Sequence, residues 1–423
     1  MKRSAQNTNW IGGMDLWMTV TAISIAILLI FVATQVQAQT FTVLHTFTGG
    51  DDGASPSAGV TLDRAGNLYG TAERGGFTGS GCGSAGCGTV FKLKQSQGSW
   101  LLNPLYVFHG GADGINPQAA VVIGPDGSLY STNEGGTRSG TVFNLRPPAT
   151  ACGSVLCPWT KTALYQFLGA GDGAGPVGTL VFDQSGNIYG VTQVGGFEDY
   201  GVVYELTHSA GGWTENVLYT SPALANPFSG VIFDSAGNLY GTTLQGGELE
   251  YGSVYQLVPS RSGWTLNTLS SFENEGDGNE PEGGLIFDPA GNLLGTTTGG
   301  GNGGGGTVFQ MTPSNGWMMT NLYSFTGFIF GPFASLSMDA AGNLYGTTDG
   351  DGAYGYGSVF KLTPMNGGWS YTDLHNFTGG SDGADPFYSP VAVDASGNLY
   401  GTTAGGGSTN CSHGCGVVWE ITP

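Results

Sequence analysis

The chain has 423 residues, and its 31 acidic and 11 basic side chains give it a formal charge of −20. A surface of this sign repels nucleic acids and anionic membranes, so a role in binding polyanions is excluded. Only 10% of the residues are charged and 78 are glycine, a composition that long helices do not tolerate. It suits a β-protein outside the cell.

The N-terminal 38 residues are typical of an export signal. Lys2 and Arg3 precede an apolar run from Leu16 to Val36, and residues 36–38 (Val-Gln-Ala) fit a small-residue cleavage site. The run of about 21 residues is also long enough to span a bilayer, so an uncleaved anchor is the alternative to a cleaved signal peptide. In both cases the rest of the chain is exported, to a secreted, periplasmic or cell-surface location. Any membrane contact is then made through this segment alone.

A short motif recurs seven times in the remaining chain, at steps of 51 to 61 residues. In its clearest form it reads AGNLYGTT at residues 341–348, after an apolar run that ends in Asp339. Asp caps a turn with its own side chain, Gly supplies the positive φ that closes it, and the alternating residues that follow favour a strand. Each copy therefore predicts a tight β-hairpin. The copies begin at Gly66, Gly127, Gly186, Gly237, Gly291, Gly342 and Gly397.

The aspartate before the turn is present in six copies, and the second copy has Asp126 two residues later instead. Regularly placed acids are compatible with an array of metal sites, but a turn of this kind needs Asp at this position. We therefore interpret them as scaffold. The six are Asp63, Asp183, Asp234, Asp288, Asp339 and Asp394.

Each repeat contains two further predicted strands. One resembles GTVFKL at 88–93, and the other opens with Trp and usually ends eight residues later in Phe, as in Trp100–Phe108; the copy that opens at Trp213 lacks the Phe. Four short antiparallel strands repeated seven times predict an all-β, seven-bladed β-propeller. A parallel β-helix is the main alternative, but it uses shorter coils and needs no hairpin in every unit.

The predicted propeller occupies residues 39–423 as one domain. The seventh unit lacks its Trp-to-Phe strand, and residues 41–47 match that strand, so the N-terminal strand is expected to complete the last blade and close the ring. The predicted blades are approximately 57–108, 118–167, 177–219, 228–272, 282–325, 333–377, and 388–423 together with 41–47.

The order LYSFTG, DGA, P, GLIFD, AGNLYGTT, GG, GTVFKLTP, GGW resembles the GloVer (Gloeobacter/Verrucomicrobia) tandem repeat, and the resemblance covers residues 41–423. Proteins of this family are exported bacterial repeat proteins of the choice-of-anchor type. The resemblance implies a secreted or surface protein of bacteria, and it carries no catalytic motif. Because the chain ends at Pro423 without a hydrophobic tail, anchoring through the C-terminus is not expected here.

The six cysteines form three close pairs, which in an exported protein favours three local disulfides. Two of the pairs occupy the same loop of the first and seventh blades, neighbours in a closed ring, so a zinc site that includes His413 is the alternative. The predicted bridges are Cys82–Cys87, Cys152–Cys157 and Cys411–Cys415.

Two sets of loops share one face of the predicted disc: those between blades, and those between the second and third strands. They are rich in Gly and vary between blades, so we expect ligand binding there. Aromatic rings of the second set are candidates for stacking on sugars, or else lean on the blade edges. They are Phe77, Phe197, Tyr200, Tyr251, Tyr354 and Tyr356.

Acidic residues on this face suggest two further chemistries. Glu73 and Glu134 end the second strands of adjacent blades, and are either an acid/base pair acting on a glycosidic bond or uronic acid, or ordinary solvated carboxylates. Asp-Gly steps between blades allow calcium binding, although no loop has the dense acidic spacing of a dedicated site and turn chemistry is favoured. These aspartates are Asp52, Asp113, Asp172, Asp277 and Asp382.

Together these features predict an exported, non-catalytic binding or surface-interaction module with an extracellular glycan or protein as partner. We expect a monomer that needs no cofactor. The alternative function is a polysaccharide-active lyase or hydrolase that uses acidic residues of the variable loops.

Overall fold

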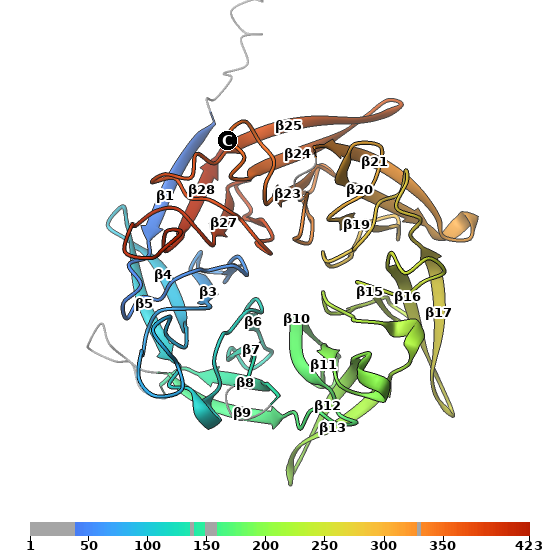
Figure 1. Ribbon diagram of the computed structural model, residues 1–423, viewed down its shortest axis with the longest axis horizontal. Coiled ribbons are helices and arrows are strands. Elements are labelled where there is room, and N and C mark those ends of the chain that lie inside the picture. The colour runs from blue at the N-terminus through green and yellow to red at the C-terminus, as the bar shows by residue number, and fades with distance from the viewer. Residues whose placement is uncertain (1–38, 136–138, 149–158, 328–330) are drawn as a thin grey trace, which may run out of the picture. The chain divides into compact units, whose positions relative to one another are not determined.

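The structure is a computed structural model that describes residues 39–135, 139–148, 159–327 and 331–423 (Figure 1). These residues form 28 β-strands and four short 3-10 helices. The strands make seven four-stranded antiparallel sheets arranged as blades around one axis. The predicted seven-bladed β-propeller is therefore confirmed. The predicted signal segment and the Cys152–Cys157 bridge lie outside the described residues.

The strands of the first six blades follow the chain from the innermost to the outermost. Blade 1 is β2 (Thr61–Leu62), β3 (Leu68–Ala72), β4 (Thr89–Ser96) and β5 (Ser99–Val107); blade 2 is β6 (Val122–Ile123), β7 (Leu129–Asn133), β8 (Thr141–Arg146) and β9 (Thr160–Gln166). Blade 3 is β10 (Ala174–Phe182), β11 (Ile188–Val194), β12 (Val202–Ser209) and β13 (Gly212–Tyr219); blade 4 is β14 (Ile232–Phe233), β15 (Leu239–Thr243), β16 (Ser253–Ser260) and β17 (Gly263–Ser271). Blade 5 is β18 (Ile286–Phe287), β19 (Leu293–Thr297), β20 (Gly304–Thr312) and β21 (Met318–Thr326); blade 6 is β22 (Ser337–Met338), β23 (Leu344–Thr348), β24 (Ser358–Met365) and β25 (Gly368–Asn376).

The seventh blade joins the two ends of the propeller. Its strands are β26 (Ala392–Val393), β27 (Leu399–Thr403), β28 (Val417–Thr422) and, outermost, β1 (Thr40–Thr46). The Phe47 amide donates to the Gly416 carbonyl at 3.1 Å, and the ring of Phe41 stacks on His375 of the preceding blade with centroids 3.7 Å apart. The N-terminal strand therefore supplies the fourth strand of the last blade, as the sequence predicted, and pairs the outer edge of β28.

Aromatic side chains hold each blade to the next one. The Phe that follows an outer strand packs against the aromatic residue of the third strand in the next blade, as in Phe108 with Phe143, whose centroids are 5.5 Å apart, and Phe272 with Phe309, at 5.4 Å. Blade 3 lacks this Phe, and buried Leu224 of η3 (Pro222–Leu224) joins the cluster around Tyr255 instead. The core is thus divided into a series of clusters between blades.

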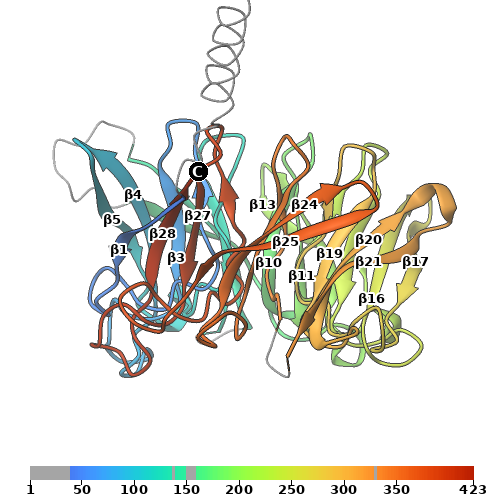
Figure 2. The same ribbon diagram turned by 90° about the horizontal axis from the view of Figure 1, so that it is seen from above.

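The strand ends define two faces of the ring, seen edge-on in Figure 2. The turn face carries the Asp-x-x-Gly-Asn turns; the loop face carries the connections between blades and the loops between second and third strands. The carboxylate of Asp234 accepts bonds from the Ala236 amide, the Asn238 amide and side chain, and the Tyr240 hydroxyl, at 2.7–3.0 Å. The turn-face aspartates are therefore capping residues of the scaffold.

Candidate functional site

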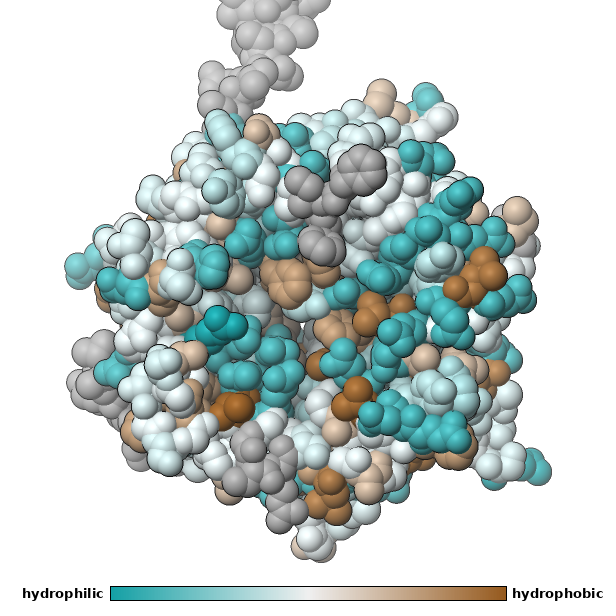
Figure 3. All heavy atoms as spheres, viewed as in Figure 1, coloured by the Kyte–Doolittle hydropathy of each residue, from teal (hydrophilic) through white to brown (hydrophobic). Residues whose placement is uncertain are grey.

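The loop face, toward which Figure 3 looks, is hollowed near the centre of the ring. Two adjacent cavities lie there. The first, here called the vestibule, has a volume of about 760 Å³ and is lined mainly by residues of blades 1 and 7, together with Asp349 of blade 6. The second, here called the inner cavity, measures about 70 Å³ and is lined by residues of all seven blades. Gln118 and Tyr388 line both cavities and mark the boundary between them.

The inner cavity is lined by the segments that lead into the innermost strands, and these segments also contribute Ser57, Gln118, Phe387 and Tyr388 to the vestibule. In most blades such a segment starts at a proline whose preceding residue has a positive φ, for example Asn116 (51°), Asn226 (54°) and Asp385 (53°). The residues that follow the proline enter the central channel. Because the side chains at these positions differ between blades, the seven copies of one backbone build a site without sevenfold symmetry.

Three carboxylates line the vestibule: Glu73, Asp349 and Asp385. The Oδ1 atom of Asp349 is inaccessible to solvent and accepts no hydrogen bond from any described residue. Burial, with a smaller effect of Asp385, raises the pKa of Asp349 to about 6, and burial also raises the pKa of Asp385. Of the cations, Arg74 lies 3.9 Å from Glu73 but is half exposed. The vestibule therefore contains more negative charge than its own cations compensate.

The inner cavity contains one carboxyl group, that of Glu282 in blade 5. The hydroxyl of Tyr388, in blade 7, donates to its Oε2 atom across the channel. Burial, with a smaller effect of Glu280, raises the pKa of Glu282 to about 7. This bond joins blades that are not neighbours in the ring.

Tyr388 has a φ of 47°, whereas the matching position of blade 3, also the second residue after a proline, is Gly178 with a φ of 70°. A left-handed backbone is unfavourable for a bulky side chain and costs about 1–2 kcal/mol. Strained backbones of this kind cluster at functional sites, which makes Tyr388 a candidate functional residue.

Aromatic rings surround Tyr388. Its ring centroid lies 5.3 Å from that of Phe228, 5.7 Å from that of Phe333 and 4.1 Å from that of Phe387. Phe228, Phe333 and Tyr388 line the inner cavity, and Phe387 lines the vestibule. The inner cavity therefore combines an aromatic wall with one carboxyl group, that of Glu282.

The loop aromatics selected from the sequence lie elsewhere on the loop face. None of the six lines the vestibule or the inner cavity, and no ring contact joins any two of them within the described residues. Phe77 packs on His109, with centroids 4.9 Å apart, and Tyr354 and Tyr356 are 61% and 46% exposed. The structure thus leaves the six rings apart from one another. The others are Phe197 and Tyr251, also exposed, and partly buried Tyr200.

Glu73 and Glu134, the predicted acidic pair, are electrostatic neighbours. Burial is the main cause that raises the pKa of Glu134, the charge of Glu73 adds to it, and a hydrogen bond with Asn116 opposes it. Only Glu73 lines the vestibule, where Gln118 donates to it at 3.4 Å. Glu282, Asp349, Asp385 and Tyr388 were not singled out from the sequence. Comparison of the residues that follow each proline would have found both: Glu282 is the one acid at the first position, and Tyr388 is the one large residue at the second, where the other copies have Ala, Gly or Ser.

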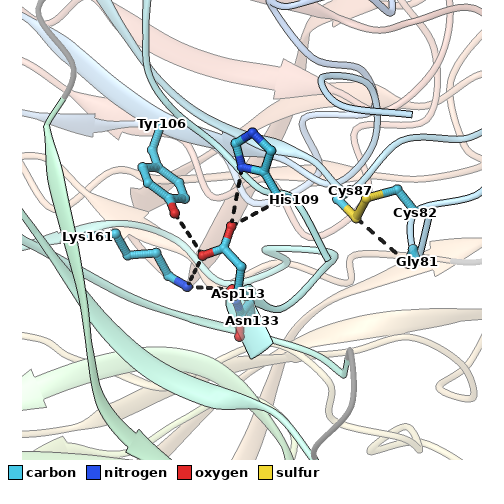
Figure 4. A network of polar contacts seen from close by, with 8 residues as sticks. All are labelled: Gly81, Cys82, Cys87, Tyr106, His109, Asp113, Asn133 and Lys161. Carbon is cyan, nitrogen blue, oxygen red and sulfur yellow. Dashed lines mark hydrogen bonds and ion pairs between the residues drawn. A yellow bond between two sulfur atoms is a disulfide. The ribbon is translucent and has the colours of Figure 1, made fainter. Parts of the chain in front are cut away.

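The Asp-Gly loops between blades form closed hydrogen-bonded turns. Asp113 accepts bonds from the His109 amide at 2.9 Å and the Tyr106 hydroxyl at 2.8 Å, and it pairs with Lys161 at 2.8 Å (Figure 4). Asp52 and Asp382 use a histidine in place of the tyrosine, with His45 and His375 at 3.2 and 3.1 Å. Backbone amides also donate to Asp172 and Asp277. The carboxylates proposed for calcium are thus engaged by protein donors.

The structure gives no support to a metal centre. Within the described part of the chain, no group of three or more His, Cys, Asp and Glu side chains is placed to hold a metal ion. Cys82–Cys87 and Cys411–Cys415 are disulfides, so the alternative zinc site at these cysteines is wrong. Among the same residues, no helix has the length and apolarity needed to cross a membrane.

Solved structures similar to this chain share its fold at low sequence identity. The extracellular domain described for a one component system from B. thetaiotaomicron is 12% identical with a TM-score of 0.54, over 89% of this chain and 39% of that one, so this chain spans well under half of that relative. A protein described as an oxidoreductase (glucose dehydrogenase) from Thermus thermophilus is 17% identical (TM-score 0.43; 71% of this chain, 95% of that one). A gluconolactonase from Xanthomonas campestris is 13% identical (0.40; 93% and 92%). At these identities the likeness concerns the fold alone.

Comparison with curated proteins gave no match. The pattern described as the Gloeobacter/Verrucomicrobia repeat matches residues 29–162, 82–286 and 250–423, which together span the propeller. The resemblance stated from the repeat motifs is thereby confirmed. The chain belongs to the Gloeobacter/Verrucomicrobia repeat family.

Proposed function

We propose that this protein is an exported, non-catalytic binding module that takes its ligand in the vestibule, with an extracellular glycan or protein as the partner. The observation that carries the proposal is the pair of adjacent cavities at the centre of the loop face. A volume of about 760 Å³ lies in the range of ligand pockets, which combine apolar walls with a few polar groups. Phe387 and Tyr388 provide such a wall, and Gln118, Asp349 and Asp385 provide the polar groups.

The two local disulfides support a location outside the cytoplasm, because such bonds persist in oxidising compartments. The dominance of acidic over basic groups restricts the partner to neutral or cationic surfaces. A secreted, periplasmic or surface binding module agrees with both features.

A glycan array with the purified protein tests the proposal, and calorimetry on each positive glycan gives its affinity. The variant Asp349→Asn changes the vestibule with little change of volume, and we expect it to weaken binding at least about tenfold through the buried carboxylate. The control Glu248→Gln makes the same charge change on an exposed loop and should leave affinity unchanged. Glycan binding that ignores Asp349→Asn but falls in Tyr354→Ala/Tyr356→Ala would move the site to the outer loops.

A lyase or hydrolase acting on polysaccharides is the second candidate, and the raised pKa values favour it. An acid with a pKa of about 6, such as Asp349, can donate a proton near neutral pH to a leaving group while a neighbouring carboxylate acts as base or nucleophile. The test is whether the parent releases reducing ends or unsaturated products from polysaccharides. If it does, and if Glu73→Gln, Glu134→Gln or Asp349→Asn abolishes this release while binding is retained, the protein is an enzyme and the non-catalytic proposal is wrong.

A further inference from the structure

The inner cavity is the part of the site that the proposed function leaves unexplained. At about 70 Å³ it has room for a few water-sized groups, which is too little for a sugar ring. Most of its lining is small, with Ala, Gly, Ser and Thr side chains. The larger lining residues are Phe228, Phe333 and Tyr388, the acid Glu282, and also Gln118, Val177 and Pro390. What enters the cavity must therefore be small and must suit aromatic and apolar walls beside one acid.

We propose that the inner cavity binds an ammonium group, primary or methylated, on the ligand that occupies the vestibule. The inference rests on the proposed function, because it assigns the chemistry of one end of that ligand. Faces of aromatic rings attract cations through their quadrupoles, and aromatic cages are a recurring means of recognising methylated ammonium groups. The three rings with the adjacent carboxyl group form such a lining.

The charges around the inner cavity also favour a cationic ligand group. No basic side chain lines the inner cavity, and Glu282 is its one ionisable acid within the described residues. Tyr388 is the one residue of the described chain that donates to Glu282, and it bonds Oε2, which leaves Oε1 for a ligand. Glu73, Asp349 and Asp385 line the path into the cavity, and acids along a cleft concentrate cations there.

An organic cation fits this lining better than a metal ion does. A hard cation such as calcium takes six to eight oxygen ligands, as a general rule, and the described chain has no set of three or more acidic, His or Cys groups placed around one point. An ammonium group instead needs one carboxylate and apolar or aromatic contacts for its methyl groups, which Phe228 and Phe333 provide.

Tyr388 connects the two parts of the site. It lines both cavities, its hydroxyl holds Glu282 in place, and its backbone adopts a conformation that blade 3 reserves for glycine. The ring is thus held at the entrance of the inner cavity against a conformational cost. There its face can contact the cation while the hydroxyl orients the carboxylate.

Calorimetric titration of the purified protein with choline tests the inference, and 3,3-dimethylbutan-1-ol, which replaces the nitrogen by carbon, is the matched neutral probe. We expect saturable 1:1 binding of choline and at least about tenfold weaker binding of the alcohol, since the cationic contribution is lost. Glu282→Gln should weaken choline binding at least about tenfold, and Phe228→Leu, which keeps an apolar side chain but removes the ring, should also weaken it. Glu248→Gln, an equal charge change on the outer loop, should bind choline as the parent does.

Circular dichroism and a melting curve establish that each variant is folded before its titration is interpreted. Equal affinity for choline and the alcohol would overturn the inference, because the cavity would then be an ordinary apolar pocket. Choline binding that Glu282→Gln leaves unchanged would also overturn it. Absence of choline binding at concentrations that leave the protein folded, together with Asp349-dependent glycan binding, would overturn the ammonium site alone. Absence of both kinds of binding would overturn the proposed function as well.

Discussion

Acidic side chains of the turn face and acidic side chains of the two cavities lie in opposite environments. On the turn face, burial alone would raise the pKa of Asp234, but hydrogen bonds from Asn238, Tyr240 and Ala236 outweigh it and lower the pKa. In the channel, Asp349 has no hydrogen-bond donor among the described residues, and burial raises its pKa to about 6. Glu282 has one donor, Tyr388, and its pKa rises to about 7. The same chemical group is stabilised as an anion in the turns and destabilised as an anion in the cavities.

The difference separates the part of each repeat that folds from the part that can bind. A carboxylate whose oxygens already accept hydrogen bonds has no free acceptor for a ligand. Because the same aspartate occurs in six copies of one turn, it also gives no means of discriminating between ligands. A buried carboxylate without donors lowers the stability of the fold, so it persists where another role requires it. Four variants, taken from the largest expected effect to the smallest, test this contrast.

Deletion of β1 (residues 39–48) removes the closed ring on which both faces depend. It exposes the edge of β28 and removes the packing of Phe41, Val43 and fully buried Phe47, so we expect aggregation or a melting temperature lower by more than about 10 °C. Calorimetric melting of the soluble fraction is the measurement. A truncated protein that melts within about 2 °C of the parent would show that the ring does not depend on this strand.

Asp234→Ala removes four hydrogen bonds from a turn and should lower the free energy of unfolding by about 1–3 kcal/mol without change in ligand affinity. Asp288→Ala is the matched variant. In the turn of Asp288, Leu294 occupies the position that Tyr240 occupies in the turn of Asp234, so Asp288 accepts three hydrogen bonds and not four. We expect denaturant unfolding to rank Asp234→Ala as the more harmful. An equal cost would mean that the tyrosine hydroxyl contributes nothing.

Glu282→Gln, unlike Asp234→Ala, should increase the stability of the protein at high pH. Because the folded-state pKa of about 7 exceeds the usual 4.5, the folded protein holds a proton that the unfolded chain releases, and this contribution to stability is lost as pH rises between these values. The variant lacks that loss. We expect its melting temperature relative to the parent to be higher at pH 8 than at pH 4.5 by about 1–3 °C. A difference that does not depend on pH would contradict the raised pKa.

Tyr354→Ala/Tyr356→Ala should have the smallest effect. Both rings are exposed and outside the two cavities, so the melting temperature should stay within about 1 °C of the parent. If a bound glycan extends from the vestibule to the outer loops, its affinity should fall by about 1 kcal/mol through lost stacking. If the double variant loses more affinity than this while Asp349→Asn binds the glycan as the parent does, the outer loops are the main binding site.

The propeller could be predicted because its determinants are local and repeated. The Asp–Gly turn, the alternating strand and the Trp-to-Phe strand can each be recognised within about ten residues. Seven copies of the repeat remove the ambiguity that a single copy would leave. Even the missing Phe of blade 3 was visible, although its replacement by Leu224 was not, because that residue reaches the cluster from a 3-10 helix outside the pattern.

The channel site could be predicted only in part, because it depends on closure. Glu282 and Tyr388 are 106 positions apart and belong to blades that are not neighbours, so no spacing in the sequence brings them together. Glu73 was selected because it ends a recognisable strand. Asp349 occupies the same strand position in blade 6, and its burial without a donor arises from tertiary packing alone.

The strand that completes blade 7 also has a kinetic consequence. Phe47 bonds to Gly416, so the pairing that seals the propeller joins residues almost a whole chain apart, while the other blades pair strands that are neighbours in sequence. Contacts of such separation form slowly, because the entropy of loop closure is lost before they contribute. During synthesis β1 cannot pair until the last blade has been made. Until then the edges of β1 are unpaired and can pair with wrong partners. The moment at which β28 is released therefore sets the earliest time at which this protein becomes resistant to aggregation.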